Sequence, residues 1–131
     1  MFPSLVGGLN VMAEGTYPRA TRLRNGSILG VHTAFRYGVN IIAVVKSDDN
    51  GVIWIPIGEA TRGIGDIDNP FVVQLPSNRV LCSFRNHSKT SNGEYTCFRI
   101  TICCSDDEGE SWRYLSTADQ ESRYGAFAVR F

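Results

Sequence analysis

Four cysteines and two histidines are the residues of this 131-residue sequence whose types could support nucleophilic catalysis or zinc binding. They are Cys82, Cys97, Cys103, Cys104, His32 and His87. A zinc site needs paired ligands at short spacing, but the sequence has no C-x-x-C pair, and neither histidine belongs to a Cys/His motif. We therefore expect the cysteines to be small apolar residues within strands. The alternative is a disulfide between Cys82 and a neighbouring strand.

Two acidic turns, 47–51 and 105–109, carry aspartates at a spacing that could suggest calcium. A calcium loop needs further oxygen ligands and a bidentate glutamate, and neither turn supplies them. Serine and aspartate side chains can instead accept hydrogen bonds from turn N–H groups. The turns are therefore predicted to be structural, with no metal site and no cofactor.

Three groups of polar residues lie next to predicted strands: Arg19 after Pro18, Asp68-Asn69 before Pro70, and Arg85-Asn86-His87. They combine carboxylate, amide and guanidinium groups. Each group also has a plain structural interpretation. The first could be a cross-strand partner for a carboxylate, the second a turn or strand-entry cap, and the third a solvated loop.

Short runs rich in β-branched and aromatic residues, separated by turn residues, predict an all-β fold. The predicted strands are 21–23, 27–35, 41–46, 53–57, 71–75, 79–85, 95–104 and 112–115. Asn25-Gly26 is a strong hairpin signal, and 86–94 is expected to be a polar loop. The chain thus predicts two units of four antiparallel strands.

The same octapeptide ends the third strand of each unit. Both copies match S-x-D-x-G-x-x-W, and Ser105 follows Ser47 by 58 residues. A repeat of this length with four strands predicts propeller blades. Glycine supplies a positive φ, and tryptophan can lie over the turn. The predicted structural residues are Ser47, Asp49, Gly51, Trp54, Ser105, Asp107, Gly109 and Trp112.

The octapeptide is the Asp-box, or BNR repeat, of sialidase-like β-propellers, and further motifs resemble the N-terminal part of fungal glycoside hydrolase family 93, the exo-α-1,5-L-arabinanases. The motifs are Tyr17-Pro18-Arg19-Ala20-Thr21, Asp68-Asn69-Pro70-Phe71 with Gln74-Leu75-Pro76, and Phe84-Arg85-Asn86-His87-Ser88-Lys89. The resemblance covers about 17–120 of this chain. It covers only roughly the first third of such a domain, whose ring needs ~4–8 blades to close.

The resemblance implies a six-bladed ring and a retaining glycosidase mechanism with two glutamates. One of these belongs to a Trp-Glu-Pro-Phe motif, where this chain reads Tyr124-Gly125-Ala126-Phe127. Gly125 can neither attack nor transfer a proton, and the other glutamate lies in a later blade of the family. We therefore expect no catalytic residue in this chain.

The resemblance also implies a sugar-facing role for the polar groups described above. Arabinan, a plant cell-wall polysaccharide, is neutral and rich in hydroxyls, so its site needs fixed carboxylates, amides and forked donors. The expected substrate-binding residues are Arg19, Asp68, Asn69, Arg85, Asn86 and His87. Arabinan or another neutral glycan is the expected partner.

Charge and hydropathy exclude other classes of partner. The chain has 13 basic and 13 acidic residues, which gives no basic footprint for nucleic acid. No apolar run reaches the ~20 residues of a membrane span. Pro3, Gly7 and Gly8 interrupt the first apolar stretch, so no signal peptide is predicted, although the resemblance implies a secreted protein.

The predicted organisation is an N-terminal segment 1–16, a blade 17–60 with Asp-box 47–54, a blade 61–118 with Asp-box 105–112, and the start of a truncated third blade over 119–131. An incomplete ring of two blades would leave an apolar face open on each outer side. Three interpretations follow: an inactive enzyme fragment, a lectin-like module that completes its ring by self-association, or a small structural interaction domain.

Overall fold

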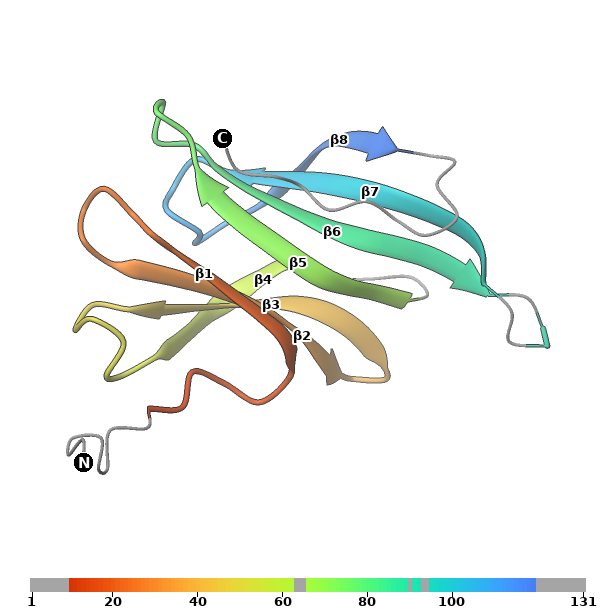
Figure 1. Cartoon of the computed structure of the whole chain (residues 1–131), viewed down its shortest axis with the longest axis horizontal. Helices are drawn as coiled ribbons and strands as arrows, with labels where there is room; N and C mark the ends of the chain where they lie inside the picture. Colours follow the sequence, from red (N-terminus) through yellow and green to blue (C-terminus); the bar gives the residue numbers. More distant parts are fainter. Residues whose placement is uncertain (1–9, 63–65, 90, 93–94, 120–131) are drawn as a thin grey trace, which may run out of the picture.

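The computed structural model of the chain describes residues 10–62, 66–89, 91–92 and 95–119, and these form eight β-strands (Figure 1). The strands are β1 (Thr16–Arg22), β2 (Ile28–Arg36), β3 (Val39–Ser47), β4 (Ile55–Arg62), β5 (Asp66–Gln74), β6 (Val80–Lys89), β7 (Tyr95–Ser105) and β8 (Arg113–Asp119). Within these described ranges no helix is long and apolar enough to cross a membrane.

The strands form two four-stranded antiparallel sheets, ordered β1-β2-β3-β4 and β5-β6-β7-β8. Each strand pairs with its sequence neighbour, as hairpin-connected strands in a propeller blade do. This confirms the predicted all-β fold of two four-stranded units. The segment expected to start a third blade begins with the last residue of β8 and otherwise lies outside the described residues, as does Gly125.

The two sheets repeat each other in register. In both inner strands a left-handed residue precedes a proline and makes a bulge: Tyr17 (φ 54°) in β1 and Asn69 (φ 58°) in β5. Equivalent residues of the first two strands are therefore 52 residues apart, whereas the Asp-boxes are 58 apart. The six extra residues lengthen the β6–β7 hairpin.

That lengthening corrects the predicted loop over 86–94. β6 continues to Lys89, and Asn86 and His87 pair in register with β5 and β7. A strand can continue through polar residues as long as its backbone N–H and C=O groups are hydrogen-bonded to the neighbouring strands. Asn86 and His87 therefore lie in the sheet, with fixed directions.

The main core lies between the two sheets. β5 contacts β1, β2 and β3, so the inner strands of the two blades lie side by side (Figure 1). Because strand residues alternate between faces, the buried residues of each sheet come from one face toward the other sheet. They include Leu29, Val31, Ile42 and Val44 from the first sheet and Ile67, Val72, Cys82 and Phe84 from the second.

The expectation of an open apolar face on the outer side of each blade is wrong for the first blade. Residues 10–15 run back over this sheet, where a β-carbon added at Gly30 would lie 2.8 Å from the Met12 sulfur. Ile41 and Val45, on the same face, are buried. In the second blade, Ile100 and Cys104 on the outward face are buried too.

The cysteines behave as small apolar strand residues, as predicted. Cys82, Cys103 and Cys104 are buried free thiols, which removes the alternative of a disulfide among these three. Burial raises the pKa of Cys82 and raises that of Cys103 to about 11, so both thiols stay protonated. The side chain of Cys97 lies outside the described residues.

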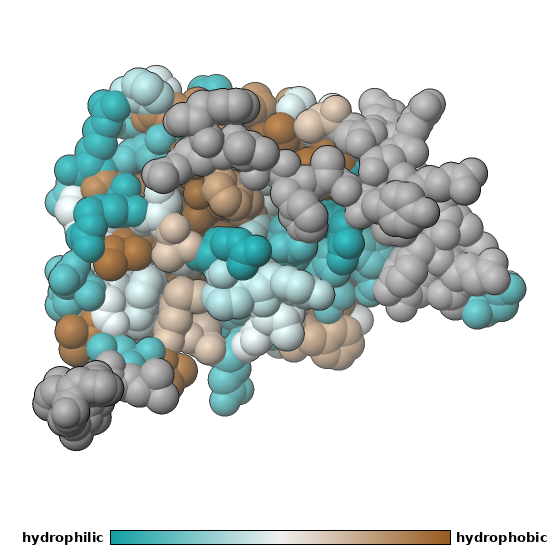
Figure 2. Space-filling view, in the orientation of Figure 1, coloured by the Kyte–Doolittle hydropathy of each residue, from teal (hydrophilic) through white to brown (hydrophobic). Residues whose placement is uncertain are grey.

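Each sheet has two ends with different contents. We call the end that carries both Asp-box turns and the β1–β2 and β5–β6 turns the Asp-box end; it lies on the left in Figure 1. Figure 2 shows mostly hydrophilic side chains along that edge. The far end carries the β2–β3 and β6–β7 hairpins and the starts of β1 and β5.

Candidate functional site

The first Asp-box makes the hydrogen bonds expected of a structural turn. Asp49 Oδ1 accepts from the Ser47 hydroxyl (2.9 Å) and the Ile53 N–H (2.8 Å). The Gly51 N–H donates to Ser47 Oγ (2.8 Å), and the Trp54 indole N–H donates to the Gly51 carbonyl (3.0 Å). The polar groups of the motif are thus satisfied within the turn.

The second Asp-box repeats this pattern. Asp107 Oδ1 accepts from the Ser105 hydroxyl (2.7 Å) and the Ser111 N–H (2.8 Å), and the Trp112 indole N–H donates to the Gly109 carbonyl (2.9 Å). Asp107 also accepts from the Ser111 hydroxyl (2.5 Å). Hydrogen bonds from Ser111, first its hydroxyl and then its N–H, lower the pKa of Asp107 to about 2.

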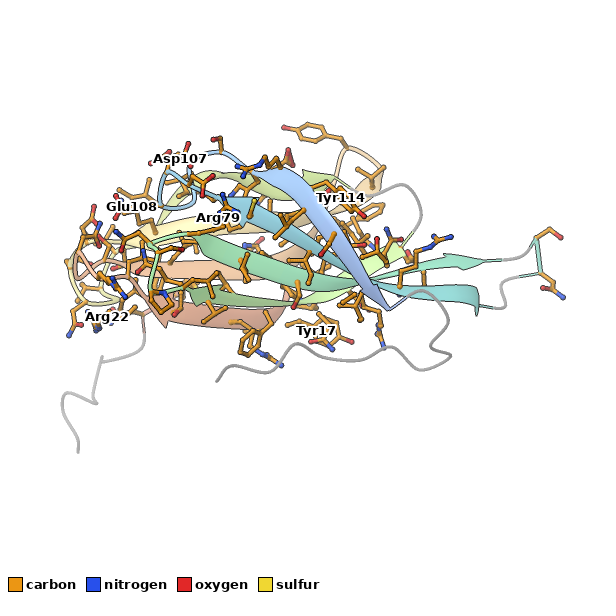
Figure 3. All side chains as sticks on the ribbon, turned by 90° about the horizontal axis from the view of Figure 1, so that it is seen from above. Tyr17, Arg22, Arg79, Asp107, Glu108 and Tyr114 are labelled. Carbon is orange, nitrogen blue, oxygen red and sulfur yellow. The ribbon has the colours of Figure 1, made fainter. Side chains whose placement is uncertain are left out.

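The Asp-box end also carries an ion pair and a polar hollow. Arg79 and Arg113 both donate to Asp106, at 2.7 Å each, and these partners, Arg79 first, lower the pKa of Asp106. The neighbouring hollow, of about 530 Å³, has only polar or charged side chains: Arg24, Asn25, Gln74, Asn78, Asp106 and Glu108. Several of them bond across the blades, as Asn25 does to Glu108 (2.5 Å). Figure 3 shows Arg79, Asp107 and Glu108 together at this end.

At the far end, three of the predicted site residues form one cluster on the second blade. Arg85 donates two hydrogen bonds of 2.8 Å to Asp68, one from Nε to Oδ1 and one from an Nη to Oδ2. His87 Nε2 lies 3.7 Å from Asp68 Oδ2. The strand register brings these three side chains together. Asp68 pairs with Arg85 and Asp66 pairs with His87, so Asp68, Arg85 and His87 lie on the same face of the sheet. Asp68 and Arg85 are 18% and 24% exposed.

The other three predicted site residues lie apart from this cluster. Asn86, between Arg85 and His87, points to the opposite face of the sheet. The Asn69 N–H donates to Thr33 Oγ1 of the first blade (3.3 Å), which joins β5 to β2. Arg19 is exposed on β1 and donates to the adjacent Pro18 carbonyl (2.9 Å).

The equivalent position of the first blade is a hollow that sequence reasoning missed. By the 52-residue offset, Asp68, Arg85 and His87 correspond to Thr16, Thr33 and Phe35. These three residues line a hollow of about 380 Å³, together with Glu14, Gly15, Ala34, Arg36 and Asn40. The repeated residue-proline pairs at 17–18 and 69–70 were the signal that could have revealed the equivalence.

Metal-binding side chains do not gather in the described part of the chain. No group of three or more His, Cys, Asp or Glu residues there could hold a metal ion.

Solved structures of an α-L-arabinofuranosidase and of an α-L-arabinanase share this fold. A complex of the GH93 α-L-arabinofuranosidase of Fusarium graminearum with arabinobiose matches at 23% identity and a TM-score of 0.62, over 79% of this chain and 31% of the enzyme. A Penicillium chrysogenum α-L-arabinanase with arabinobiose matches at 21% identity and a TM-score of 0.63, over 87% and 35%. The Fusarium enzyme with an iminosugar inhibitor matches at 24% identity and a TM-score of 0.59.

These matches define the class of the fold: two adjacent four-stranded blades of a β-propeller. They confirm the predicted resemblance to family 93, and at 21–24% identity they establish it at the level of the fold. The chain spans about a third of the length of the solved structures it matches. No protein-family model matches the sequence, and no curated protein matches it.

Proposed function

We propose that this chain is part of a glycoside hydrolase-like propeller of the arabinan-degrading type, and that its far end binds neutral glycan without hydrolysing it. The observation that carries the proposal is the Asp68–Arg85–His87 cluster at the far end of β5 and β6. The fold likeness gives the glycan its class, because two of the matching structures are complexes with arabinobiose.

The cluster suits an uncharged ligand with many hydroxyls. Asp68 and Arg85 carry opposite charges and offset each other at 2.8 Å. A carboxylate has about four lone-pair positions and a guanidinium five N–H donors, so the pair can still bond to sugar hydroxyls. Its half-buried position and bidentate geometry hold these groups in fixed directions.

The same pairing argues for binding rather than hydrolysis. A retaining glycosidase needs one carboxylate free to attack and a second ~5–5.5 Å away to handle the proton. Both oxygens of Asp68 accept from Arg85, which holds the carboxylate in a fixed orientation. Asp68 is therefore assigned an orienting role.

Titration of the purified chain with arabinobiose and linear arabino-oligosaccharides tests the proposal, with Asp68→Asn as the variant and Asp106→Asn as the matched control. Each change removes the charge of an aspartate held by arginine in the second blade, but at opposite ends. We expect D68N to weaken binding about tenfold, the effect of losing a charged hydrogen bond, and D106N to leave it unchanged. Equal weakening by both variants contradicts a far-end site.

Hydrolysis is assayed on the same samples. We expect no arabinobiose to appear when the chain is incubated with linear arabinan. Release of arabinobiose at a rate proportional to protein concentration contradicts the non-hydrolytic role.

The second candidate is a lectin-like or structural module that completes a ring by self-association. Ring closure requires another copy to pack on the outer face of the first blade. That face is covered at Gly30 by Met12, which argues against this arrangement. Light scattering distinguishes the two candidates: we expect a monomer, whereas a sharp trimer that binds glycan favours the ring.

A further inference from the structure

The far-end hollow of the first blade has the residue types of a small-ligand site. Phe35, an aromatic residue in its lining, is 72% exposed, so a ligand could still cover much of its surface. Thr16 and Thr33 supply hydroxyls, and Asn40 supplies an amide. An aromatic wall with a few fixed polar groups is the usual make-up of such sites, and about 380 Å³ lies in their lower size range.

The polar groups are held in defined directions. Asn40 Nδ2 donates to Asp66 Oδ1 of β5 (3.2 Å), which orients the amide. Thr33 Oγ1 accepts the Asn69 N–H (3.3 Å), so its own hydroxyl proton can point elsewhere. Both bonds join the hollow to β5, the strand that also carries Asp68. The hollow and the Asp68–Arg85–His87 cluster are therefore neighbours along the far end.

Charge selects the class of ligand. The lining contains one acidic residue, Glu14, and one basic residue, Arg36, so their formal charges cancel. A phosphate or a carboxylate ligand would need an excess of cationic donors. An uncharged ligand with an apolar face and several hydroxyls fits both the aromatic wall and the polar groups.

We propose that the hollow lined by Thr16, Thr33, Phe35, Arg36 and Asn40 is a subsite for one uncharged sugar ring, which packs on Phe35. The inference rests on the proposed function and adds a second position to it. A glycan chain bound at Asp68 and Arg85 extends its next unit across β5 into the hollow. The second blade lacks this subsite, because the Asp68–Arg85 pair occupies the equivalent register position.

Phe35→Ala and Tyr37→Ala provide the matched test. Both aromatics belong to the β2–β3 hairpin region and are 72% and 85% exposed, but only Phe35 lines the hollow. Arabinobiose and arabinotetraose are titrated into each variant by calorimetry. We expect F35A to weaken arabinotetraose binding about tenfold and Y37A to change it less than about twofold.

Thr16→Trp gives an independent test, because it fills the hollow from an exposed strand position. We expect it to weaken arabinotetraose binding at least as much as F35A. Wild-type affinity in both F35A and T16W overturns the subsite, and so does equal weakening by F35A and Y37A.

The outcomes separate the two proposals. Loss of affinity in D68N but in neither F35A nor T16W overturns the subsite and leaves the proposed function standing. Loss in F35A and T16W but not in D68N supports the hollow and overturns the assigned cluster. A wild-type chain that binds no arabino-oligosaccharide overturns both.

Discussion

The two blades share the main hydrogen bonds of their Asp-box turns and carry different side chains at the far end. Ser47 and Asp49 bond as Ser105 and Asp107 do, with distances that agree within 0.2 Å. At the far end, the positions of Asp68 and Arg85 hold Thr16 and Thr33 in the first blade. The turn must satisfy its own backbone groups in every blade, so its sequence repeats.

The far end obeys a weaker constraint. Strand pairing there comes from the backbone and tolerates many side chains, so the two blades can differ without losing the sheet. The first blade consequently has a hollow where the second has an ion pair. The side chains that differ between the two blades therefore lie at the far end, where we propose the glycan site.

The largest expected effect concerns the glycines of the two Asp-boxes, which look equivalent. Gly51 and Gly109 have φ values of 90° and 93°, but a β-carbon at Gly109 would lie 2.7 Å from a Leu29 methyl, whereas at Gly51 nothing is closer than 3.8 Å. We expect Gly109→Ala to cost about 3 kcal/mol of unfolding free energy, from backbone strain plus overlap with the first blade. Gly51→Ala should cost about 1 kcal/mol, from strain alone. Urea unfolding measures both; equal losses would contradict the contact between blades.

The next prediction transfers the chemistry of the second blade to the first. Thr16→Asp with Thr33→Arg places an Asp–Arg pair in the register that Asp68 and Arg85 occupy. We expect the pair to fill the hollow and to weaken arabinotetraose binding more than about tenfold. Loss of the Asn69 N–H acceptor should cost only about 1 kcal/mol of stability. Wild-type binding by the folded double variant would show that the hollow takes no sugar.

A third prediction compares two buried aromatic side chains at equivalent positions of the two blades. His32 in the first blade corresponds to Phe84 in the second, and both are buried. Burial is the main cause of the lowered pKa of His32. The contact with the Thr33 carbonyl acts in the opposite direction and raises the pKa, and the positive charge of Arg36 lowers it further. The unfolded chain therefore binds a proton more readily than the folded chain once the pH falls below about 6.5.

Stability should consequently fall in the wild type as the pH is lowered from 7 to 5. We expect His32→Phe, which installs the residue of the second blade, to remove most of this dependence. Urea unfolding at several pH values measures the slope. An unchanged slope in H32F would assign the dependence to other groups.

The residues of the Asp-box end could be predicted from the sequence because the information is local. S-x-D-x-G-x-x-W places donor, acceptor and positive φ within eight residues, and two copies fix the blade repeat. The apolar role of Cys82, Cys103 and Cys104 followed from the absence of a C-x-x-C pair and of a Cys/His motif. Local spacing was sufficient in each case.

The far end depends on register, which the sequence does not display. Asp68 and Arg85 meet because a bulge at Asn69 shifts β5 against β6. Strand alternation places Asn86, which adjoins Arg85 in sequence, on the other face. Thr16, Thr33 and Phe35 are ordinary strand residues whose role depends on the hollow between them. Met12 covers Gly30 through a chain reversal that no motif marks.

The smallest expected effect tests how alike the two Asp-boxes are. Asp107 receives the Ser111 hydroxyl in addition to its N–H, whereas the equivalent Ile53 of the first blade offers Asp49 only an N–H. Both carboxyls have lowered pKa values, and that of Asp107 falls to about 2, with the Ser111 hydroxyl as the first cause. Because the folded pKa lies below the ordinary 3.8, Asp107 stabilises the fold above that pH, and this contribution is lost as the pH falls toward 2.

Removing the hydroxyl at 111 and adding one at 53 should change the pKa values of Asp107 and Asp49 in opposite directions. We expect Ser111→Ala to raise the pKa of Asp107, and Ile53→Ser, at an exposed position, to lower that of Asp49. Carboxyl ¹³C NMR titration between pH 1.5 and pH 6 measures both, a range chosen to bracket the two pKa values. Each shift should occur in the mutated turn only, because each hydroxyl acts within its own turn. A shift of Asp107 in I53S would instead mean that the two turns are coupled through the core, and the blades would then not be independent repeats.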